Sequence, residues 1–371
     1  MNFGWRAQSG GMPEKIPMGG GFWYGDGRSS PPTFGGIVRT YTNLWDEFIS
    51  VQNFVRAYKD ARKGKGKQRS VAEFRHGWAL RLYALRRDVM EGRFHTSLYR
   101  SMTITEPKKR TIYKLPFCPD RIVQHALVNV LAPVLEKKLI ADTYSCIPGR
   151  GQILASQRCM EAVRRNKYCL KCDVRHFYPS IDQHILSAMY HRIIKDGRLM
   201  AVIDDIIFSF PGGKNCPIGN YLSQWSGNFY LSVLDDFVKR ELHVRDYIRY
   251  CDDFLLFSDD KAFLHGCRKR IGLFLRDRLR LEYSRSDVFS VRQGVDFCGY
   301  RHFDNFVLLR KSTKLRQERR LREIRKAVES GSFDRDKCRA SLDSMAGWMR
   351  HAKTHRLKEK YGLPELRELV A

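Results

Sequence analysis

The sequence lacks the long apolar runs that membrane-spanning and secreted proteins need. It has no run of about 18 apolar residues, and its first residues, MNFGWRAQSGG, lack a signal-peptide hydrophobic stretch. Cysteine is sparse, because ten thiols among 371 residues are too few for a disulfide scaffold. The one CxxC pair, Cys169 and Cys172, has no second pair at zinc-site spacing. We therefore expect a cytoplasmic protein whose cysteines are small core residues.

Acidic residues are also scarce relative to basic ones. Lys and Arg number 67 against 40 Asp and Glu, so the formal net charge is +27. Such an excess destabilises a compact chain by self-repulsion unless a polyanion neutralises it. Nucleic acid is the expected partner, and an anionic membrane is the second choice. With 43% hydrophobic residues, the chain has enough apolar material for two or three structural units.

The N-terminal part divides into a tail and a helical region. Residues 1–36 hold ten glycines and four prolines, a composition that predicts a flexible tail. Apolar residues then recur at steps of three and four, which indicates one buried face of an amphipathic helix. The residues on that face are Leu44, Phe48, Val51, Val55 and Tyr58. A second helical stretch follows a basic loop and ends at Gly92.

Further along, short strands and helices alternate. We expect two strands around a basic turn in 99–117, an amphipathic helix over 120–139, and a helix after the glycine-bounded PGRG loop. We also expect a strand over 168–174, a long helix over 222–242 and a hairpin over 246–260. Residues 310–326 carry nine Lys or Arg against two Glu, which predicts a basic helix.

The central chemical feature is a pair of adjacent acids, Asp252 and Asp253, at the bend of the hairpin. Like charges side by side repel, and a turn needs at most one of them for its geometry. Asp173 ends the apolar strand YCLKC, and pairing of the two strands would bring it beside Asp252. Hard divalent cations bind such carboxylates, and two ions stabilise phosphoryl transfer. The alternative is a solvated turn.

These residues also resemble a known family. Tyr250-Cys251-Asp252-Asp253 resembles the Tyr-x-Asp-Asp motif of reverse transcriptases, and the segment 173–182 (DVRHFYPSID) resembles their first palm motif. Phe297-Cys298-Gly299-Tyr300 resembles the primer grip, and 120–125 (DRIVQH) resembles a stretch of the fingers. The four segments occur in the family's order over about 100–303.

A narrower resemblance concerns Ile218-Gly219-Asn220-Tyr221-Leu222-Ser223-Gln224. Most reverse transcriptases carry Q-G-x-x-x-S-P here, whereas this I-G-x-x-x-S-Q variant resembles the enzymes of diversity-generating retroelements. That family copies a template-repeat RNA into cDNA with errors at adenines, for mutagenic retrohoming. The resemblance implies template RNA, RNA/DNA duplex and dNTPs as partners, no membrane, and a small basic ring-forming accessory variability protein. It also implies a bacterial or phage-infected cell.

The resemblance implies an α+β fold of the right-hand polymerase type. Its parts would be a helical N-terminal region over 37–98, fingers over 99–167, a palm over 168–303 and a helical thumb over 304–371. The palm would consist of an antiparallel sheet with helices and would carry the catalytic acids.

The resemblance also suggests residue roles. Asp173, Asp252 and Asp253 are the expected catalytic residues, and with Val174, through its backbone carbonyl, the expected ligands of two Mg²⁺ ions, for which Mn²⁺ can substitute. The expected nucleotide-binding residues are Lys108, Lys109, Arg110, Tyr178, Ile218, Gly219 and Gln224. Guanidinium matches phosphate bidentately and ammonium acts as a point charge.

Alternatives stay open at four of these positions. Lys108 and Lys109 also fit a solvated turn, and Tyr178 fits either a steric gate against the ribose 2′-hydroxyl or a core aromatic. Ile218 offers only apolar contact where glutamine could hydrogen-bond, so we expect it to lower fidelity. A plain hydrophobic residue before a glycine turn is the alternative.

Nucleic-acid contacts complete the expected site. Phe297, Cys298, Gly299 and Tyr300 would form the primer grip. The phosphate backbone would be contacted by Arg150, Lys311, Lys314, Arg316, Arg319, Arg320 and Arg322. Two other functions compete: a related bacterial defence-type reverse transcriptase, and a catalytically silent RNA-binding scaffold.

Overall fold

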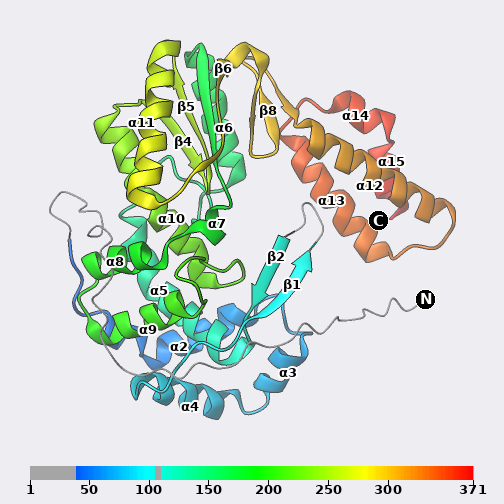
Figure 1. Ribbon diagram of the computed structural model, residues 1–371. Helices are drawn as coiled ribbons and strands as arrows, with labels where there is room; N and C mark the ends of the chain where they lie inside the picture. The colour runs from blue at the N-terminus through cyan, green and yellow to red at the C-terminus, as the bar shows by residue number, and fades with distance from the viewer. Residues whose placement is uncertain (1–38, 105–109, 371) are drawn as a thin grey trace. The chain divides into compact units, whose positions relative to one another are not determined.

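The computed structural model describes residues 39–104 and 110–370 of the chain (Figure 1). These residues belong to one contact unit, Phe34–Ala371. The tail expected over 1–36 and the basic turn with Lys108 and Lys109 lie outside the described residues. Over the described ranges, no helix is both long and apolar enough to cross a membrane.

The N-terminal region is helical, as predicted, but its first helix is broken at Ser50. The Ser50 side chain accepts a hydrogen bond from the backbone N–H of Asn53 and so caps a new helix. The break shifts the helical phase, so Val51 is 54% exposed while Phe54 and Tyr58 are buried. The expectation that Val51 faces the core was therefore wrong. The helices are α1 (Trp45–Phe48), α2 (Val51–Arg62), α3 (Arg69–Arg75) and α4 (Trp78–Met90).

Helix α5 (Ile122–Glu136) is buried on most of its circumference rather than amphipathic. Ten of its 15 residues are buried, and it packs against α2 and α10 (Tyr221–Asp236). An apolar surface all round is typical of a helix inside a core. The hairpin predicted before it is confirmed, with strands β1 (Arg100–Ile104) and β2 (Arg110–Lys114) paired antiparallel.

A four-stranded antiparallel sheet lies at the centre of the described chain. Its strand order is β4-β5-β3-β6, so the predicted hairpin and the predicted strand 168–174 are neighbours. The strands are β3 (Tyr168–Val174), β4 (Asp246–Tyr250), β5 (Asp253–Ser258) and β6 (Tyr283–Ser290). The pairing of β3 with β5 aligns the two segments that carry the predicted acids.

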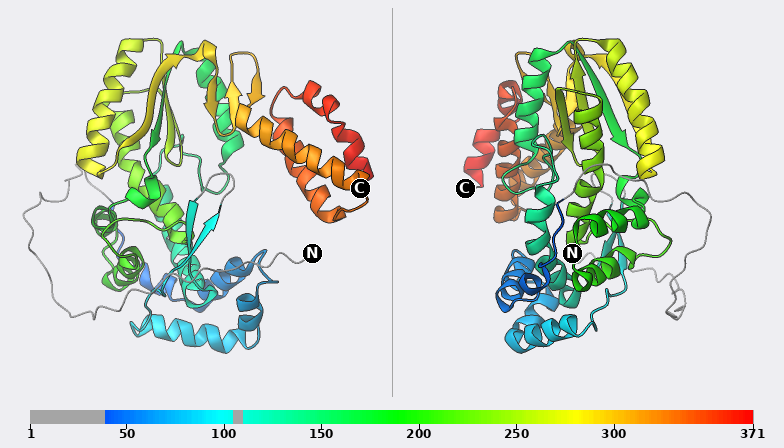
Figure 2. Two further views of the ribbon diagram at one scale, coloured as in Figure 1. Left: turned by 45° about the vertical axis from the view of Figure 1, so that its right-hand side comes forward. Right: turned by 90° about the vertical axis from the view of Figure 1, so that its left-hand side faces the viewer.

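Helices cover both faces of this sheet (Figure 1, Figure 2). On one face, Leu170 and Cys172 join a large core with α10 and α11 (Lys261–Leu279). On the other face, Cys169 joins a smaller core beneath α6 (Gln152–Arg165). Burial on both faces explains why β3 is apolar almost throughout. The remaining helices here are α7 (Phe177–Ser180), α8 (Gln183–Ile193) and α9 (Gly197–Phe208).

The C-terminal region has its own small sheet and apolar core. Three antiparallel strands, β7 (Val295–Phe297), β8 (Tyr300–His302) and β9 (Val307–Leu309), precede the predicted basic helix α12 (Lys311–Glu329). Leu321 and Ile324 of α12 pack with α13 (Arg335–Arg350), α14 (His355–Lys360) and α15 (Leu363–Leu369). The mixed helix-and-sheet class is confirmed, while the fingers, palm and thumb divisions stay a prediction.

Candidate active site

The predicted acids gather at one end of the central sheet. Asp173 and Asp253 are directly opposite each other in the antiparallel register of β3 and β5. Directly opposed side chains point to the same face, with Cβ atoms about 4.5–5.5 Å apart. Asp252 lies beside Asp253, in the turn Cys251-Asp252 that joins β4 to β5. The register thus pairs two of the acids, and the turn adds the third.

A β-bulge supports Asp173. The pairing of β3 with β6 shifts between Asp173 and Val174, which skips Ser284. The Ser284 hydroxyl donates to the Asp173 carboxylate Oδ2, and it also lies 3.3 Å from the Asp173 carbonyl oxygen. Bulges often re-aim side chains next to active sites. Val174, the other residue expected at the metal, has its side chain buried in the core.

Within the described part of the chain, Asp253 has one carboxylate oxygen with a hydrogen-bond partner and one without. Its Oδ2 accepts a hydrogen bond from Lys171 Nζ at 3.1 Å, while its Oδ1 is buried without a hydrogen-bond partner among the described residues. Burial raises the pKa of Asp253 to about 6; Lys171 opposes that shift, and Asp173 and Asp252 add to it. A buried carboxylate oxygen without a hydrogen-bond partner is unusual, so this oxygen is a candidate ligand for a cation.

The acids have the donor chemistry of a divalent-cation site without a preformed cage. Across the described residues, no group of three His, Cys, Asp or Glu side chains is arranged to hold a metal ion. Three carboxylates at one sheet end nevertheless fit a hard cation, which prefers oxygen ligands. The partnerless Asp253 Oδ1 supports that fit. Asp173, Asp252 and Asp253 are therefore the residues present that would hold a divalent cation.

Arg249 supports the turn that carries Asp252. This guanidinium is fully buried and forms a two-pronged ion pair with Asp235 of α10, at 2.7 and 2.6 Å. Its Nη1 also donates to the Cys251 carbonyl at 3.1 Å. Cys251 has φ +58°, so the turn begins in the left-handed region. Burial alone would lower the pKa of Arg249, but Asp235 outweighs burial and raises it.

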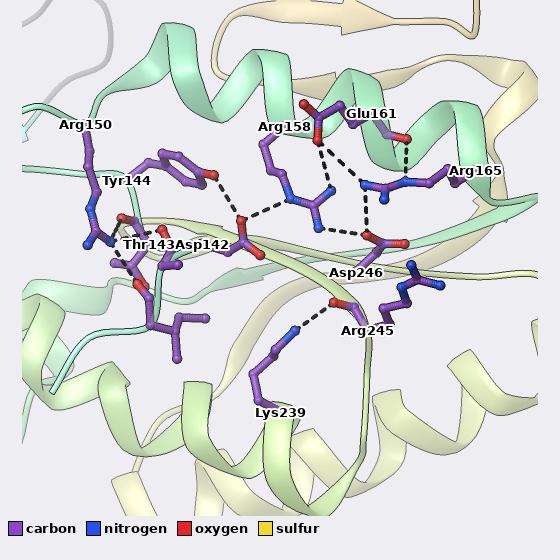
Figure 3. Close-up of polar contacts among 12 residues, drawn as sticks. Asp142, Thr143, Tyr144, Arg150, Arg158, Glu161, Arg165, Lys239, Arg245 and Asp246 are labelled. Atoms are coloured by element: carbon purple, nitrogen blue, oxygen red, sulfur yellow. Dashed lines mark hydrogen bonds and ion pairs between the residues drawn. The ribbon is translucent and has the colours of Figure 1, made fainter.

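Arg150 forms hydrogen bonds with the loop that lies beside β4. Its Nη1 donates to the carbonyls of Ile140, Ala141 and Thr143 at 2.9–3.0 Å (Figure 3). Thr143 pairs with Arg249 at the edge of β4. The described contacts of Arg150 therefore support the loop, and its expected contact with template phosphate stays a prediction.

Tyr178 lies between α10 and the Cys251 turn. A Cβ at Gly227 would come within 3.0 Å of the Tyr178 ring, so the glycine makes room for this aromatic. The Tyr178 hydroxyl is 3.7 Å from Cys251 Sγ. Burial raises the pKa of Tyr178, which keeps the hydroxyl protonated. Both the gate and the core-aromatic interpretations fit these contacts.

The Ile218-Gly219 turn is fastened to the β1–β2 hairpin. The Tyr113 N–H donates to the Ile218 carbonyl at 3.1 Å. Gly219 has φ +125°, and a Cβ there would lie 2.1 Å from the Tyr113 carbonyl oxygen. Only glycine fits so close an approach. Ile218 is half-buried, and Gln224 is exposed on α10; Arg110 begins β2.

The predicted primer grip is a tight hairpin between β7 and β8. Cys298 and Gly299 form its turn, both with positive φ, while Phe297 and Tyr300 are buried. A Cβ at Gly299 would come within 2.5 Å of the Trp348 ring of α13. The Tyr300 hydroxyl donates to the Trp348 carbonyl at 3.1 Å. The turn is therefore packed directly on the C-terminal helices.

The six predicted phosphate-contacting cations of α12 are all exposed. They are Lys311, Lys314, Arg316, Arg319, Arg320 and Arg322. Arg316, Arg319 and Arg320 line a cleft of about 360 Å³ together with Trp348. An exposed cationic surface beside an aromatic fits a nucleic-acid backbone.

Sequence reasoning missed three polar residues that support the acids: Lys171, Ser284 and Arg249. Lys171 and Arg249 each interrupt an otherwise apolar strand, YCLKC and DYIRY, and that interruption was the available signal. Ser284 gave no signal, because its role depends on a bulge that the sequence pattern does not reveal.

Comparison with known proteins points to one family. Residues 105–302 match the family model for reverse transcriptase (RNA-dependent DNA polymerase). The chain is 28% identical over 177 residues to the retron Ec73 reverse transcriptase of Escherichia coli, which covers 43% of this chain and 54% of that protein. It is 22% identical over 273 residues to protein YkfC of Escherichia coli, which covers 60% of this chain and 71% of that protein.

The match to the retron enzyme thus spans about half of that enzyme's length. The family match covers more than half of this chain and includes the central sheet with all three acids. The chain belongs to the reverse transcriptase (RNA-dependent DNA polymerase) family.

Proposed function

We propose that this protein is an RNA-directed DNA polymerase whose chemistry takes place at Asp173, Asp252 and Asp253. The observation that carries the proposal is the direct pairing of Asp173 with Asp253 at the sheet end, beside the Asp252 turn, in a chain of this family. Three carboxylates at one sheet end are unfavourable for folding unless cations offset their repulsion. The net charge of +27 supports a nucleic-acid substrate.

The acids would act in nucleotidyl transfer with two Mg²⁺ ions, or Mn²⁺, which supply charge stabilisation for the attacking and leaving oxygens. Asp173 and Asp252 are the main proposed ligands, with Asp253 and the Val174 carbonyl completing the set. Ser284 would orient Asp173 through its hydrogen bond to Oδ2. Lys171 keeps one oxygen of Asp253 occupied, so Asp253 has one oxygen to offer.

The incoming dNTP would be held from the β1–β2 side of the site. Lys108, Lys109 and Arg110 are the proposed triphosphate contacts. Gly219 would allow the backbone to approach the nucleotide closely, and Gln224 would lie near the nucleotide. The half-buried Tyr178 would act as a gate against the ribose 2′-hydroxyl.

Template RNA and the RNA/DNA duplex would contact the exposed cations of α12 and the hairpin 297–300. We accordingly assign 99–167 to fingers, 168–303 to a palm and 304–371 to a thumb, after an N-terminal helical region over 37–98. The cleft lined by Arg316, Arg320 and Trp348 supports a duplex contact on the thumb.

The subtype we favour is a diversity-generating retroelement enzyme. Ile218 in the I-G-x-x-x-S-Q segment supports it, because an apolar side chain forfeits less when a wrong pair forms. The product would be cDNA with adenine-directed errors for mutagenic retrohoming. A small basic ring-forming accessory protein is the expected partner.

A second candidate is a bacterial defence-type reverse transcriptase. The similarity to a retron reverse transcriptase favours it. The chemistry would be the same, while template and product would differ.

One experiment separates these functions. Magnesium-dependent primer extension on RNA, followed by sequencing of the products, would be run for the parent and for Ile218→Gln. Errors concentrated at template adenines, reduced in Ile218→Gln, would support the retroelement enzyme. Faithful copying by the parent favours the defence-type enzyme. If the parent makes no product even with cognate RNA and accessory protein, it is a silent RNA-binding scaffold.

A further inference from the structure

Lys171 is a buried cation in the middle of the central sheet. Lys171 is only 5% exposed, and its neighbours on this face of the sheet include Cys169 and Phe297. Lysine is almost never buried to this extent unless it is paired, because its charge must leave water. Lys171 and Asp173 are two residues apart on β3, so both point to the same face.

One ammonium group connects two parts of the candidate site. Lys171 Nζ donates to Asp253 Oδ2 at 3.1 Å and to the backbone carbonyl of Asp296. It also lies 6.0 Å from the centre of the Phe297 ring. Asp253 belongs to the central sheet, whereas Asp296 and Phe297 belong to β7. The side chain therefore spans from the acids to the hairpin 297–300.

Packing does not require a charge at this position. The surrounding cluster is apolar, with Cys169, Leu255, Phe257 and Val295 buried in it. An apolar side chain of similar length would fill the same space and avoid the desolvation cost. The reason for a lysine is therefore found in its two hydrogen bonds, to Asp253 and to the Asp296 carbonyl, rather than in the core.

We propose that Lys171 is a positioning residue that fixes the Asp253 carboxylate and ties it to the hairpin Phe297–Tyr300, so that the acid and the hairpin keep one relative placement. This role rests on the proposed function, which assigns the acid to chemistry and the hairpin to the primer. Lys171 touches neither nucleotide nor primer in this role. It limits Asp253 to one available oxygen and holds β7 against β3.

The test compares Lys171→Met with a matched control, Lys239→Met. Methionine keeps the length and apolar volume of lysine and removes its charge. Lys239 Nζ also holds two backbone carbonyls, those of Val244 at 3.1 Å and Arg245 at 2.7 Å, and Figure 3 shows the contact with Arg245. Amide hydrogen exchange over 295–302 reports the tie without any need for activity. Single-nucleotide extension then gives kcat and KM.

We expect faster exchange over 295–302 in Lys171→Met alone, with kcat lowered about tenfold or more and KM for the nucleotide nearly unchanged, because a charge-assisted hydrogen bond is lost. Unchanged exchange in a folded Lys171→Met, or equal effects in Lys239→Met, would overturn the proposal. Should Lys171→Met fail to fold, Lys171→Gln replaces it in the same comparison. If the parent protein does not extend the primer, the proposed function is contradicted. The hydrogen-exchange result still decides whether Lys171 holds the hairpin 297–300 to Asp253.

Discussion

Removing the Arg249 guanidinium is the sharpest available perturbation of the turn that carries Asp252. Arg249 and Asp235 have no exposed side-chain area, and their two contacts measure 2.7 and 2.6 Å. Arg249→Met leaves the Asp235 carboxylate buried with only the hydroxyls of Tyr247 and Thr143 as donors among its described partners. It also frees the Cys251 carbonyl from its donor Nη1.

The expected magnitude follows from the burial of both charges. Removing one partner of a buried ion pair costs about 3–5 kcal/mol, because the other charge is left uncompensated. At an m-value of about 3 kcal/mol/M, this lowers the urea midpoint by about 1–1.7 M. Since whole domains are stable by only about 5–15 kcal/mol, the variant loses a large part of its free energy of unfolding.

The assay is urea unfolding followed by circular dichroism, with two companion variants. Arg240→Met removes the cation of the neighbouring exposed pair Arg240–Asp236, whose side chains are 80% and 48% exposed, and should change stability by about 0.5 kcal/mol or less. Arg249→Met with Asp235→Leu removes both buried charges and should recover about half of the loss or more. A loss below about 1 kcal/mol in Arg249→Met, or a double variant no more stable than Arg249→Met, would refute the reasoning.

Two further predictions concern the acid and the glycine turn. The pKa of Asp253 is raised from 3.8 to about 6, so its contribution to stability is present below pH 3.8 and is lost as the pH rises through 6. Protons and Mg²⁺ then compete for Asp253, so the Mg²⁺ concentration giving half-maximal primer extension should be higher at pH 5.5 than at 7.5; an equal requirement would contradict this. Gly219→Ala should lower stability by about 1–3 kcal/mol and impair nucleotide incorporation, because its Cβ meets the Tyr113 carbonyl. Gly212→Ala, with φ +97° and open space around it, shows the backbone cost alone and should spare incorporation.

Local patterns predicted much of the secondary structure. The strand 168–174, the hairpin that carries Asp252 and Asp253, and the basic helix after Arg310 all follow from short apolar runs and charge patterns. The helix break at Ser50 was missed because a single capping hydrogen bond decides it. The burial of α5 on most sides was missed because it depends on which other helices pack around α5, and the sequence of α5 alone does not show them.

The meeting of the three acids at one end of the sheet could be predicted from the sequence, but the residues that support them could not. Asp173, Asp252 and Asp253 stand out because charges interrupt apolar strands at strand ends. Lys171 and Arg249 interrupt strands too, yet their partners come from segments far along the chain. Sequence spacing does not reveal such long-range contacts. They depend on the register between β3 and β5 and on where β7 lies against β3.

The most direct test of the central claim is RNA-templated DNA synthesis by three matched proteins. They are the parent, Asp252→Asn and Asp259→Asn, since Asp259 belongs to another adjacent acid pair, just after the opposite end of β5. Asp259 accepts from the Lys167 N–H at 2.9 Å and lies outside the candidate site. We predict that the parent and Asp259→Asn extend the primer, while Asp252→Asn is slower by about a hundredfold or more. Equal rates for Asp252→Asn and the parent would contradict the account.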